Sequence, residues 1–126
     1  MTEPRTILIA DRHTHVVNAV KARLQSAGFL VATASDGAEA YALAIGLRPD
    51  AIIADYQVPR LSGPELCVRL ARDPLTCDIP VILLTATGLD ASTIPADNIV
   101  RVLKKPLRPQ LLLETVQELL AESLAV

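Results

Sequence analysis

The sequence predicts an α/β fold: a single doubly wound (βα)5 domain with a parallel five-stranded sheet in the strand order 2-1-3-4-5. Two observations predict this fold. Five short apolar runs alternate with longer segments in which apolar residues recur every three or four positions, the pattern of buried strands joined by amphipathic helices. Each run ends in polar or turn-forming residues, as strands do where a sheet meets its loops. The 126 residues suit one domain, which we assign to residues 1–126.

The first strand is predicted over Thr6–Ala10, where consecutive apolar residues indicate burial on both faces. In the helix after it, apolar residues recur at spacings of three and four, and Gly28 is placed to end it. A second strand over Phe29–Ala34 alternates and contains β-branched residues. The next helix, Ala38–Leu47, stops before Pro49, because proline disfavours helical backbone in the preceding residue. The apolar positions of the first helix are Val16, Val17, Val20, Leu24 and Ala27.

The central strand is the most informative element. Ala51–Ala54 is apolar throughout and ends abruptly at Asp55. A proline-containing turn and a helix over Pro64–Arg72 follow. Val81–Leu84 is the most hydrophobic run and predicts the fourth strand. A carboxylate that ends an interior strand lies at the sheet edge where open α/β folds bind their ligands.

The last part of the chain is less regular. Residues 88–98 are weakly patterned and predict at most a short helix around Asp90–Ile94, which Pro95 ends. The fifth strand is predicted over Ile99–Leu103. A long amphipathic helix, Arg108–Leu124, completes the chain.

Composition excludes several functional classes. A net charge of −2 and only three aromatic residues argue against a nucleic-acid surface, which needs a basic excess and stacking rings. No apolar run approaches the roughly 20 residues of a membrane span, and the first run meets Asp11 too soon for a signal peptide. Cys67 and Cys77 form neither a disulfide framework nor a metal knuckle. We therefore expect a cytoplasmic protein.

Four polar residues stand at the carboxyl ends of predicted strands, namely Asp11, Asp55, Thr85 and Lys105. In a doubly wound sheet these ends converge, so the four side chains are expected in one cleft. The set suits phosphoryl chemistry. A carboxylate is a nucleophile toward phosphorus, a second carboxylate helps to hold Mg²⁺, and a hydroxyl and an ammonium bind phosphoryl oxygens. Taken singly, each residue also fits a capping, turn or solvated-loop role.

Several motifs resemble those of a known family, the response-regulator receiver domains of two-component signalling. The resemblance covers nearly the full length and implies a CheY-like, flavodoxin-like fold and a signalling domain, not an enzyme. The matching segments are PDAIIADYQVPRLSG for the phosphoacceptor, DGAEA for the start of the second helix, DPLTCDIPVILLTA for the third loop and fourth strand, and LKKPL for the lysine–proline segment.

The resemblance also implies a role for each candidate residue. Asp55 would accept a phosphoryl group from a histidine kinase or histidine phosphotransfer protein, and Thr85 and Lys105 would bind that group. Asp11, Asp55 and the backbone carbonyl of Gln57 would hold Mg²⁺. The signal would pass to a downstream protein target or output domain, and a homodimer is one expected form. This domain itself would bind neither nucleic acid nor membrane.

The acidic pocket is atypical, because Arg12 follows Asp11 where receivers usually carry a second, metal-contacting acid. Three acids and one lysine have a formal charge of −2, whereas Asp11, Asp55, Arg12 and Lys105 sum to zero. If Arg12 turns inward, a unit charge pair at about 4 Å is worth about 4 kcal/mol at an effective dielectric near 20. The arginine would then weaken Mg²⁺ binding and pair with Asp55. If it turns outward, a weakened site still works.

Other departures concern the surroundings of the pocket. Val102 stands where receivers generally carry Tyr or Phe, so switching by ring rotation is excluded. The surface formed by residues 88–98, which commonly carries output or dimer contacts, is expected to be remodelled. His13 and His15 are two residues apart and would face different ways on a helix, so we expect exposed first-turn residues and no metal site.

Three functions remain open. The favoured one is a receiver phosphorylated on Asp55. The second is an atypical pseudo-receiver, an interaction module that is never phosphorylated because Arg12 replaces a metal-binding acid. The third is a flavodoxin-like redox protein, which would need a Ser/Thr/Gly-rich first loop and aromatic residues to hold a flavin; the loop DRHTH and the three aromatics do not supply these.

Overall fold

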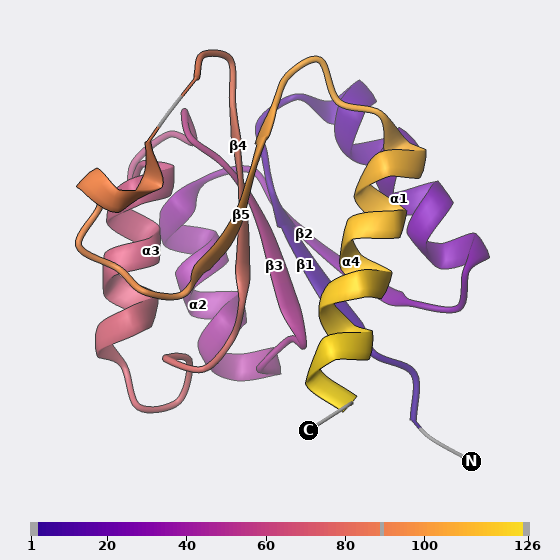
Figure 1. Ribbon diagram of the computed structural model, residues 1–126, viewed down its shortest axis with the longest axis horizontal. Coiled ribbons are helices and arrows are strands. Elements are labelled where there is room, and N and C mark those ends of the chain that lie inside the picture. Colours follow the sequence, from indigo (N-terminus) through magenta and orange to yellow (C-terminus); the bar gives the residue numbers. More distant parts are fainter. Residues whose placement is uncertain (1–2, 89, 125–126) are drawn as a thin grey trace.

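The sheet is parallel and has the predicted strand order. The computed structural model describes residues 3–88 and 90–124 (Figure 1). Five strands are hydrogen-bonded in the order β2-β1-β3-β4-β5, so β3 lies at the centre of the sheet. In chain order the elements are β1 (Thr6–Ala10), α1 (Thr14–Ser26), β2 (Leu30–Ala34), α2 (Gly37–Leu47), β3 (Ala51–Asp55), α3 (Gly63–Arg72), β4 (Val81–Thr85), the 3-10 turn η1 (Ala91–Thr93), β5 (Ile99–Lys104) and α4 (Pro109–Leu124).

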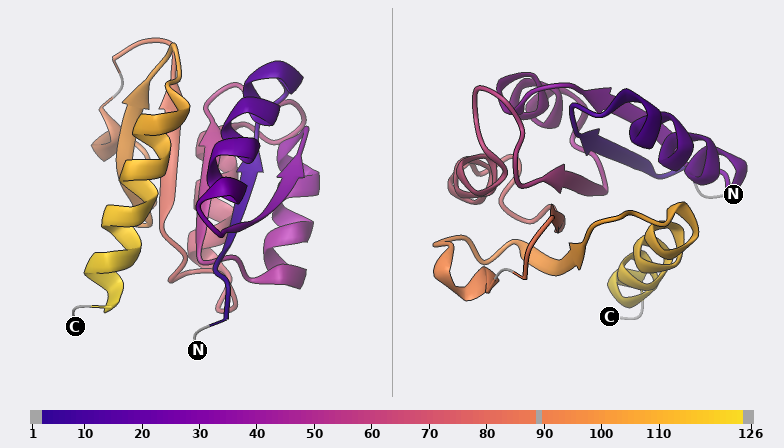
Figure 2. Two further views of the ribbon diagram at one scale, coloured as in Figure 1. Left: turned by 90° about the vertical axis from the view of Figure 1, so that its right-hand side faces the viewer. Right: turned by 90° about the horizontal axis from the view of Figure 1, so that it is seen from above.

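Helices cover both faces of the sheet. α1 and α4 lie side by side on one face, and α2 and α3 cover the other (Figure 1 and Figure 2). Successive residues of a strand point to opposite faces, and the core divides accordingly. Leu8 and Ile52 belong to the cluster under α2 and α3, whereas Ile7 and Ile53 belong to the cluster under α1 and α4. Within residues 3–88 and 90–124, no helix has both the length and the apolar character needed to cross a membrane.

The first helix ends where the sequence predicts. Gly28 has a φ of +96°, a left-handed conformation that glycine adopts without steric penalty. Its N–H donates to the carbonyl of Gln25 at 3.0 Å, and the N–H of Phe29 donates to the carbonyl of Leu24 at 3.2 Å. These two hydrogen bonds form a Schellman motif, which turns the chain directly into β2.

The connection between β4 and β5 departs from a strict (βα)5 pattern. Its described residues contain only the 3-10 turn η1, which confirms the prediction of at most a short helix around Asp90–Ile94. The Asp90 carboxylate accepts hydrogen bonds from the hydroxyl and the backbone N–H of Ser92, at 2.7 and 3.0 Å. These bonds hold the pKa of Asp90 below its usual value and compete with helix formation. Pro95 prevents continuation of the turn.

Three strands run one residue further than predicted. β3 includes Asp55, β4 includes Thr85 and β5 includes Lys104. Asp55 is in register with Leu84, and the next residue, Tyr56, donates its backbone N–H to the Leu84 carbonyl at 2.8 Å. Asp55 and Thr85, two candidate site residues, are therefore the last residues of their strands, where strand pairing holds their backbone.

Cys67 is expected to resist alkylation in the folded protein. It lies fully buried on α3, and burial raises the pKa of its thiol to about 12, so almost no reactive thiolate forms at mildly alkaline pH. Cys77 is only partly buried. Iodoacetamide should therefore add one group to the folded chain and two to the denatured chain, as read by intact mass. Rapid modification of Cys67 in the folded state would contradict this burial.

Candidate functional site

The four strand-end residues lie at one edge of the sheet. Asp11 follows β1, Asp55 and Thr85 end β3 and β4, and Lys105 follows β5. Because these four strands are neighbours in a parallel sheet, their carboxyl ends meet at the same edge. Asp11, Asp55 and Thr85 are buried, with exposed fractions of 4 %, 3 % and 4 %. The fold thus brings the predicted residues together at this edge, where Asp55, Thr85 and Lys105 line one pocket.

Lys105 contacts both carboxylates of the cleft. Its Nζ lies 2.8 Å from Oδ2 of Asp55 and 3.8 Å from Oδ2 of Asp11. Its backbone N–H donates to the carbonyl of Thr85 at 2.8 Å, which fixes the point from which the side chain extends. The ammonium donates a charge-assisted hydrogen bond to Asp55. It also offsets part of the repulsion between the two buried carboxylates.

Backbone groups orient the other polar atoms. The N–H of Gln57 donates to Oδ1 of Asp55 at 3.3 Å, and the N–H of Thr87 donates to the hydroxyl oxygen of Thr85 at 3.2 Å. Asp55, Gln57, Thr85 and Lys105 line a pocket of about 170 Å³. A pocket that combines a carboxylate with a hydroxyl, an ammonium and backbone groups suits a small tetrahedral anion joined to that carboxylate.

Arg12 lines the wall of an open pocket of about 570 Å³ beside His13 and Lys105, and it does not reach the carboxylates. Its side chain is exposed, and among the contacts of residues 3–88 and 90–124 none joins it to Asp11 or Asp55. The structure contradicts the inward orientation, in which Arg12 pairs with Asp55. An outward arginine keeps its charged head in water and avoids desolvation. The two carboxylates and the Lys105 ammonium, which contact one another, sum to a formal charge of −1.

His13 occupies the place considered for Arg12. Its Nδ1 lies 2.9 Å from Oδ1 of Asp11 and 3.7 Å from Oδ2 of Asp55. Helical spacing, applied to His13 and His15 as first-turn residues of one helix, did not predict these contacts. His13 is instead the N-cap of α1, with φ −90° and ψ 93°, so helical spacing does not govern its direction. His15 is exposed, as expected.

A signal for this contact is present in the sequence. Asp11 and His13 are separated by one residue and immediately precede a helical pattern. In an extended segment, residues two apart point the same way. A histidine two residues beyond a buried strand-end carboxylate is therefore a candidate partner for that carboxylate.

The donor set fits a divalent cation. Asp11, His13 and Asp55 each present one ligand atom, and these atoms lie within 4.8 Å of one another. Oδ2 of Asp11 is buried and has no hydrogen-bond partner among the described residues. The Lys105 ammonium, 3.8 Å away, offsets part of its charge, and a bound cation or water would satisfy its remaining hydrogen-bonding capacity. The residues present therefore suit an ion at the acidic corner of the cleft.

Val102 places no aromatic ring near the cleft. It lies in β5 opposite Leu83, is partly buried, and packs against the core under α2 and α3. A valine has no ring that could rotate between inward and outward positions. Any switch in this protein must therefore use other residues.

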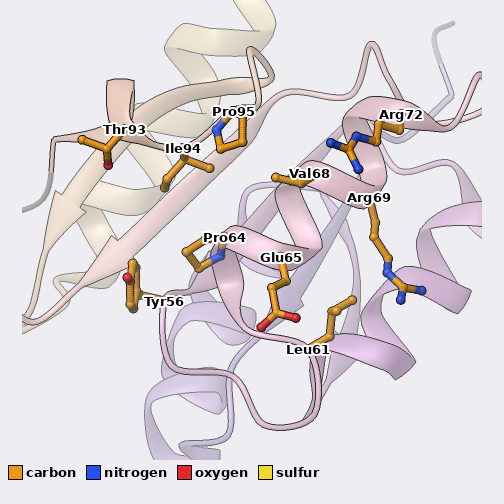
Figure 3. Close-up of a pocket in the computed structure, with 10 residues that line it drawn as sticks. All are labelled: Tyr56, Leu61, Pro64, Glu65, Val68, Arg69, Arg72, Thr93, Ile94 and Pro95. Carbon is orange, nitrogen blue, oxygen red and sulfur yellow. The ribbon is translucent and has the colours of Figure 1, made fainter.

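A second pocket lies beside the connection that lacks an α-helix. It measures about 490 Å³ and separates α3 from the η1 segment, with Pro64, Val68 and Ile94 on its walls (Figure 3). Tyr56 lines both this outer pocket and the pocket at Asp55. The 3-10 turn and this hollow agree with the prediction of a remodelled surface at residues 88–98.

Comparisons with known proteins give one consistent family. The model of the response regulator receiver domain matches residues 7–117. Among curated proteins, the DNA-binding dual master transcriptional regulator RpaA of Synechocystis is 44 % identical over 82 residues, which are 65 % of this chain and 34 % of that protein. The chain spans about a third of the length of the first curated relatives it matches.

Solved structures show the same fold. The chemotaxis response regulator CheY4 of Vibrio cholerae superposes with a TM-score of 0.83 at 30 % identity, covering 92 % of this chain and 98 % of that one. The receiver domain of the sensor histidine kinase PA1611 of Pseudomonas aeruginosa, solved with a magnesium ion in its active-site cleft, has a TM-score of 0.80 at 25 % identity, covering 92 % and 97 %. Both are structures to which this chain is similar.

Proposed function

Because the chain belongs to the response regulator receiver domain family, we propose that it accepts a phosphoryl group on Asp55 from a histidine kinase or histidine phosphotransfer protein. The geometry around Asp55 carries the proposal. This carboxylate is buried, the Lys105 ammonium lies 2.8 Å away, and Thr85 lines the same pocket. The domain signals through contacts with other proteins and, in this proposal, turns over no substrate of its own.

The transfer uses Asp55 as a nucleophile. One carboxylate oxygen bonds to phosphorus while the bond from phosphorus to the donor's nitrogen or oxygen breaks, and that electron pair leaves with the donor. The product is an acyl phosphate. The Lys105 ammonium, which pairs with the free carboxylate, is placed to pair with phosphoryl oxygens, and the Thr85 hydroxyl is placed to donate a hydrogen bond to one of them.

Asp11, Asp55 and the backbone carbonyl of Gln57 are the groups that we propose hold Mg²⁺. When bound, the ion offsets the negative charge of the phosphoryl oxygens. The buried Oδ2 of Asp11, which has no hydrogen-bond partner among the described residues, supports this assignment. So does the magnesium in the cleft of the related PA1611 receiver domain.

Incubation with acetyl phosphate and Mg²⁺ is expected to add one phosphoryl group to the protein. Intact mass measures the adduct, and omission of the metal should lower its yield. Asp55→Asn keeps the shape of the side chain but removes the nucleophilic carboxylate, so its adduct should be absent. An adduct of equal yield in Asp55→Asn would place the chemistry elsewhere, and no adduct in the parent protein would contradict the proposal.

Arg12→Asp separates this proposal from the pseudo-receiver alternative. Since Arg12 is exposed, the parent protein should already form the adduct. The substitution should strengthen Mg²⁺ binding, by roughly tenfold, through one added carboxylate and one lost cation at partly screened distance. Mg²⁺ titration and adduct yield measure both effects. If the parent protein formed no adduct and Arg12→Asp did form one, the pseudo-receiver alternative would be favoured.

We further propose that the phosphorylated domain acts on a downstream protein or output domain in the cytoplasm, with a homodimer as one possible assembly. The relatives support an output domain, since RpaA is a DNA-binding transcriptional regulator about three times the length of the matched segment. The net charge of −2 argues against nucleic-acid binding by this domain itself. Tyr56, which borders both pockets, is placed to carry a change at Asp55 to the outer surface.

A further inference from the structure

The acidic corner of the cleft, formed by Asp11, His13 and Asp55, contains one nitrogen ligand, the His13 ring, beside the two carboxylates. Asp11 uses a single oxygen, Oδ1, for its hydrogen bonds to His13: the backbone N–H lies at 2.8 Å and the ring Nδ1 at 2.9 Å. The other oxygen, Oδ2, is buried and has no hydrogen-bond partner within residues 3–88 and 90–124. The Lys105 Nζ lies 3.8 Å from it, beyond hydrogen-bonding distance. Asp11 therefore holds His13 in place and keeps a second oxygen that takes part in no direct hydrogen bond among the described residues.

The spacing of the donors suits direct coordination. Ligand atoms bound 2.0–2.1 Å from an ion at right angles to each other lie about 3 Å apart. Nδ1 of His13 lies 2.9 Å from one Asp11 oxygen and 3.7 Å from an Asp55 oxygen. Small side-chain rotations would let an ion lie between the ring nitrogen and the two carboxylates.

The local backbone fixes this position without help from the ion. His13 is the N-cap residue, and the helix begins with the hydrogen bond from Val17 N–H to its carbonyl at 3.0 Å. The hydrogen bond from its own N–H to Asp11 anchors the other side. The ring is 47 % exposed, which leaves an open path for a hydrated ion.

We propose that His13 is a protein ligand of the divalent cation, and that the site therefore prefers a later transition-metal ion such as Co²⁺ or Zn²⁺ to Mg²⁺. Mg²⁺ favours oxygen ligands, whereas imidazole nitrogen suits first-row transition metals. Arg12, which follows Asp11, is exposed, and its side chain supplies no oxygen ligand that would favour Mg²⁺. The inference deepens the proposed function, since it concerns the ion of the same cleft.

Co²⁺ and Mg²⁺ titrations of the folded protein test the inference. Calorimetry measures both dissociation constants, and the visible spectrum of bound Co²⁺ reports nitrogen coordination. The parent protein should bind Co²⁺ at least tenfold more tightly than Mg²⁺. His13→Gln should weaken Co²⁺ binding about 10- to 100-fold and change Mg²⁺ binding by less than about threefold. The exposed His15, changed to Gln, is the matched control and should alter neither constant.

A second variant at the same position reverses the preference. His13→Asp offers an oxygen in place of the ring nitrogen and adds a negative charge, so Mg²⁺ binding should strengthen while the ratio of Co²⁺ to Mg²⁺ affinity falls. The inference is overturned if His13→Gln leaves the Co²⁺ affinity and the Co²⁺ spectrum unchanged, or if it lowers the affinities for Co²⁺ and Mg²⁺ equally.

The two proposals fail in different assays. The protein could form the acetyl phosphate adduct while the Co²⁺ spectrum is the same in His13→Gln as in the parent. That result would support phosphorylation and contradict the assignment of His13 as a ligand. Co²⁺ binding that depends on His13, in a protein that forms no adduct with any of these ions, would uphold the ligand and contradict the phosphoacceptor function.

Discussion

Lys105→Met should slow formation of the Asp55 adduct by about 10²- to 10³-fold, the usual effect of removing one donor that stabilises transition-state charge. The ammonium lies 2.8 Å from Asp55 and in the pocket that would hold the phosphoryl group. Methionine keeps much of the aliphatic length but has no charge to place there. The rate of adduct formation from acetyl phosphate, followed by intact mass, measures the effect.

The same substitution should strengthen cation binding. Removing Lys105 takes a positive charge from beside Asp55 and Asp11, at 2.8 and 3.8 Å, and so leaves two buried carboxylates with no nearby ammonium. We expect divalent-cation affinity to rise roughly tenfold or more. A slower transfer together with tighter ion binding distinguishes loss of the ammonium from simple unfolding.

Lys104→Met provides the matched control. Lys104 is the preceding residue and has an exposed side chain, so its loss removes the same charge from the protein without touching the cleft. Adduct formation and cation affinity should both stay near the parent values. If Lys104→Met slowed the transfer as much as Lys105→Met, overall charge would explain the effect and the specific role of Lys105 would be wrong.

Gly63→Ala should destabilise the protein by about 3 kcal/mol, the upper part of the range for inserting atoms into a packed site. A Cβ on Gly63 would lie 2.5 Å from the carbonyl oxygen of Asp55, 2.8 Å from Cα of Tyr56 and 3.0 Å from a methyl of Leu83. The first two are backbone atoms and cannot rotate away. The loop after β3 must therefore move, and Asp55 with it.

Thermal or denaturant unfolding measures this loss, which corresponds to a fall of roughly 10 °C in the melting temperature. Adduct formation should also slow in the fraction that remains folded, since the displaced carbonyl belongs to the phosphoacceptor itself. Normal stability of Gly63→Ala would show that the loop tolerates a Cβ, contrary to the close approach seen here.

Gly46→Ala is the control for the chemical change. Gly46 lies near the end of α2, and a Cβ there meets nothing within 4 Å. Alanine is the better helix former, so stability should rise by about 0.5–1 kcal/mol. If alanine lowers the free energy of unfolding at Gly63 and raises it at Gly46, the loss at Gly63 must come from the contact with the backbone of Asp55 and Tyr56.

Much of the fold was predictable because its signals are local. A run of apolar residues such as Ala51–Ala54 indicates burial on both faces, and this requires a central strand covered by helices. Gly28 marks the end of α1 because only glycine readily takes the left-handed backbone found there. The weak pattern of residues 88–98 likewise predicted the loss of a regular helix, and the structure has a 3-10 turn.

The sequence by itself also determined that Asp11, Asp55, Thr85 and Lys105 share a cleft. Each residue stands at a strand end, and the parallel order of the sheet brings those ends to one edge. This inference needs only the topology and no knowledge of side-chain direction. It therefore holds even where a predicted strand ends one residue before the observed one.

Only the tertiary structure decided between Arg12 and His13. Both residues follow the same strand, and the sequence left the inward and outward orientations of Arg12 open. The choice depends on the extended backbone of His13 and on the position of Asp55, which arrives from another strand. Burying a guanidinium beside Lys105 would also have required desolvation of a second cation. Composition and residue spacing give neither the position of Asp55 relative to His13 nor the desolvation cost of a buried arginine, because both depend on how distant segments pack together.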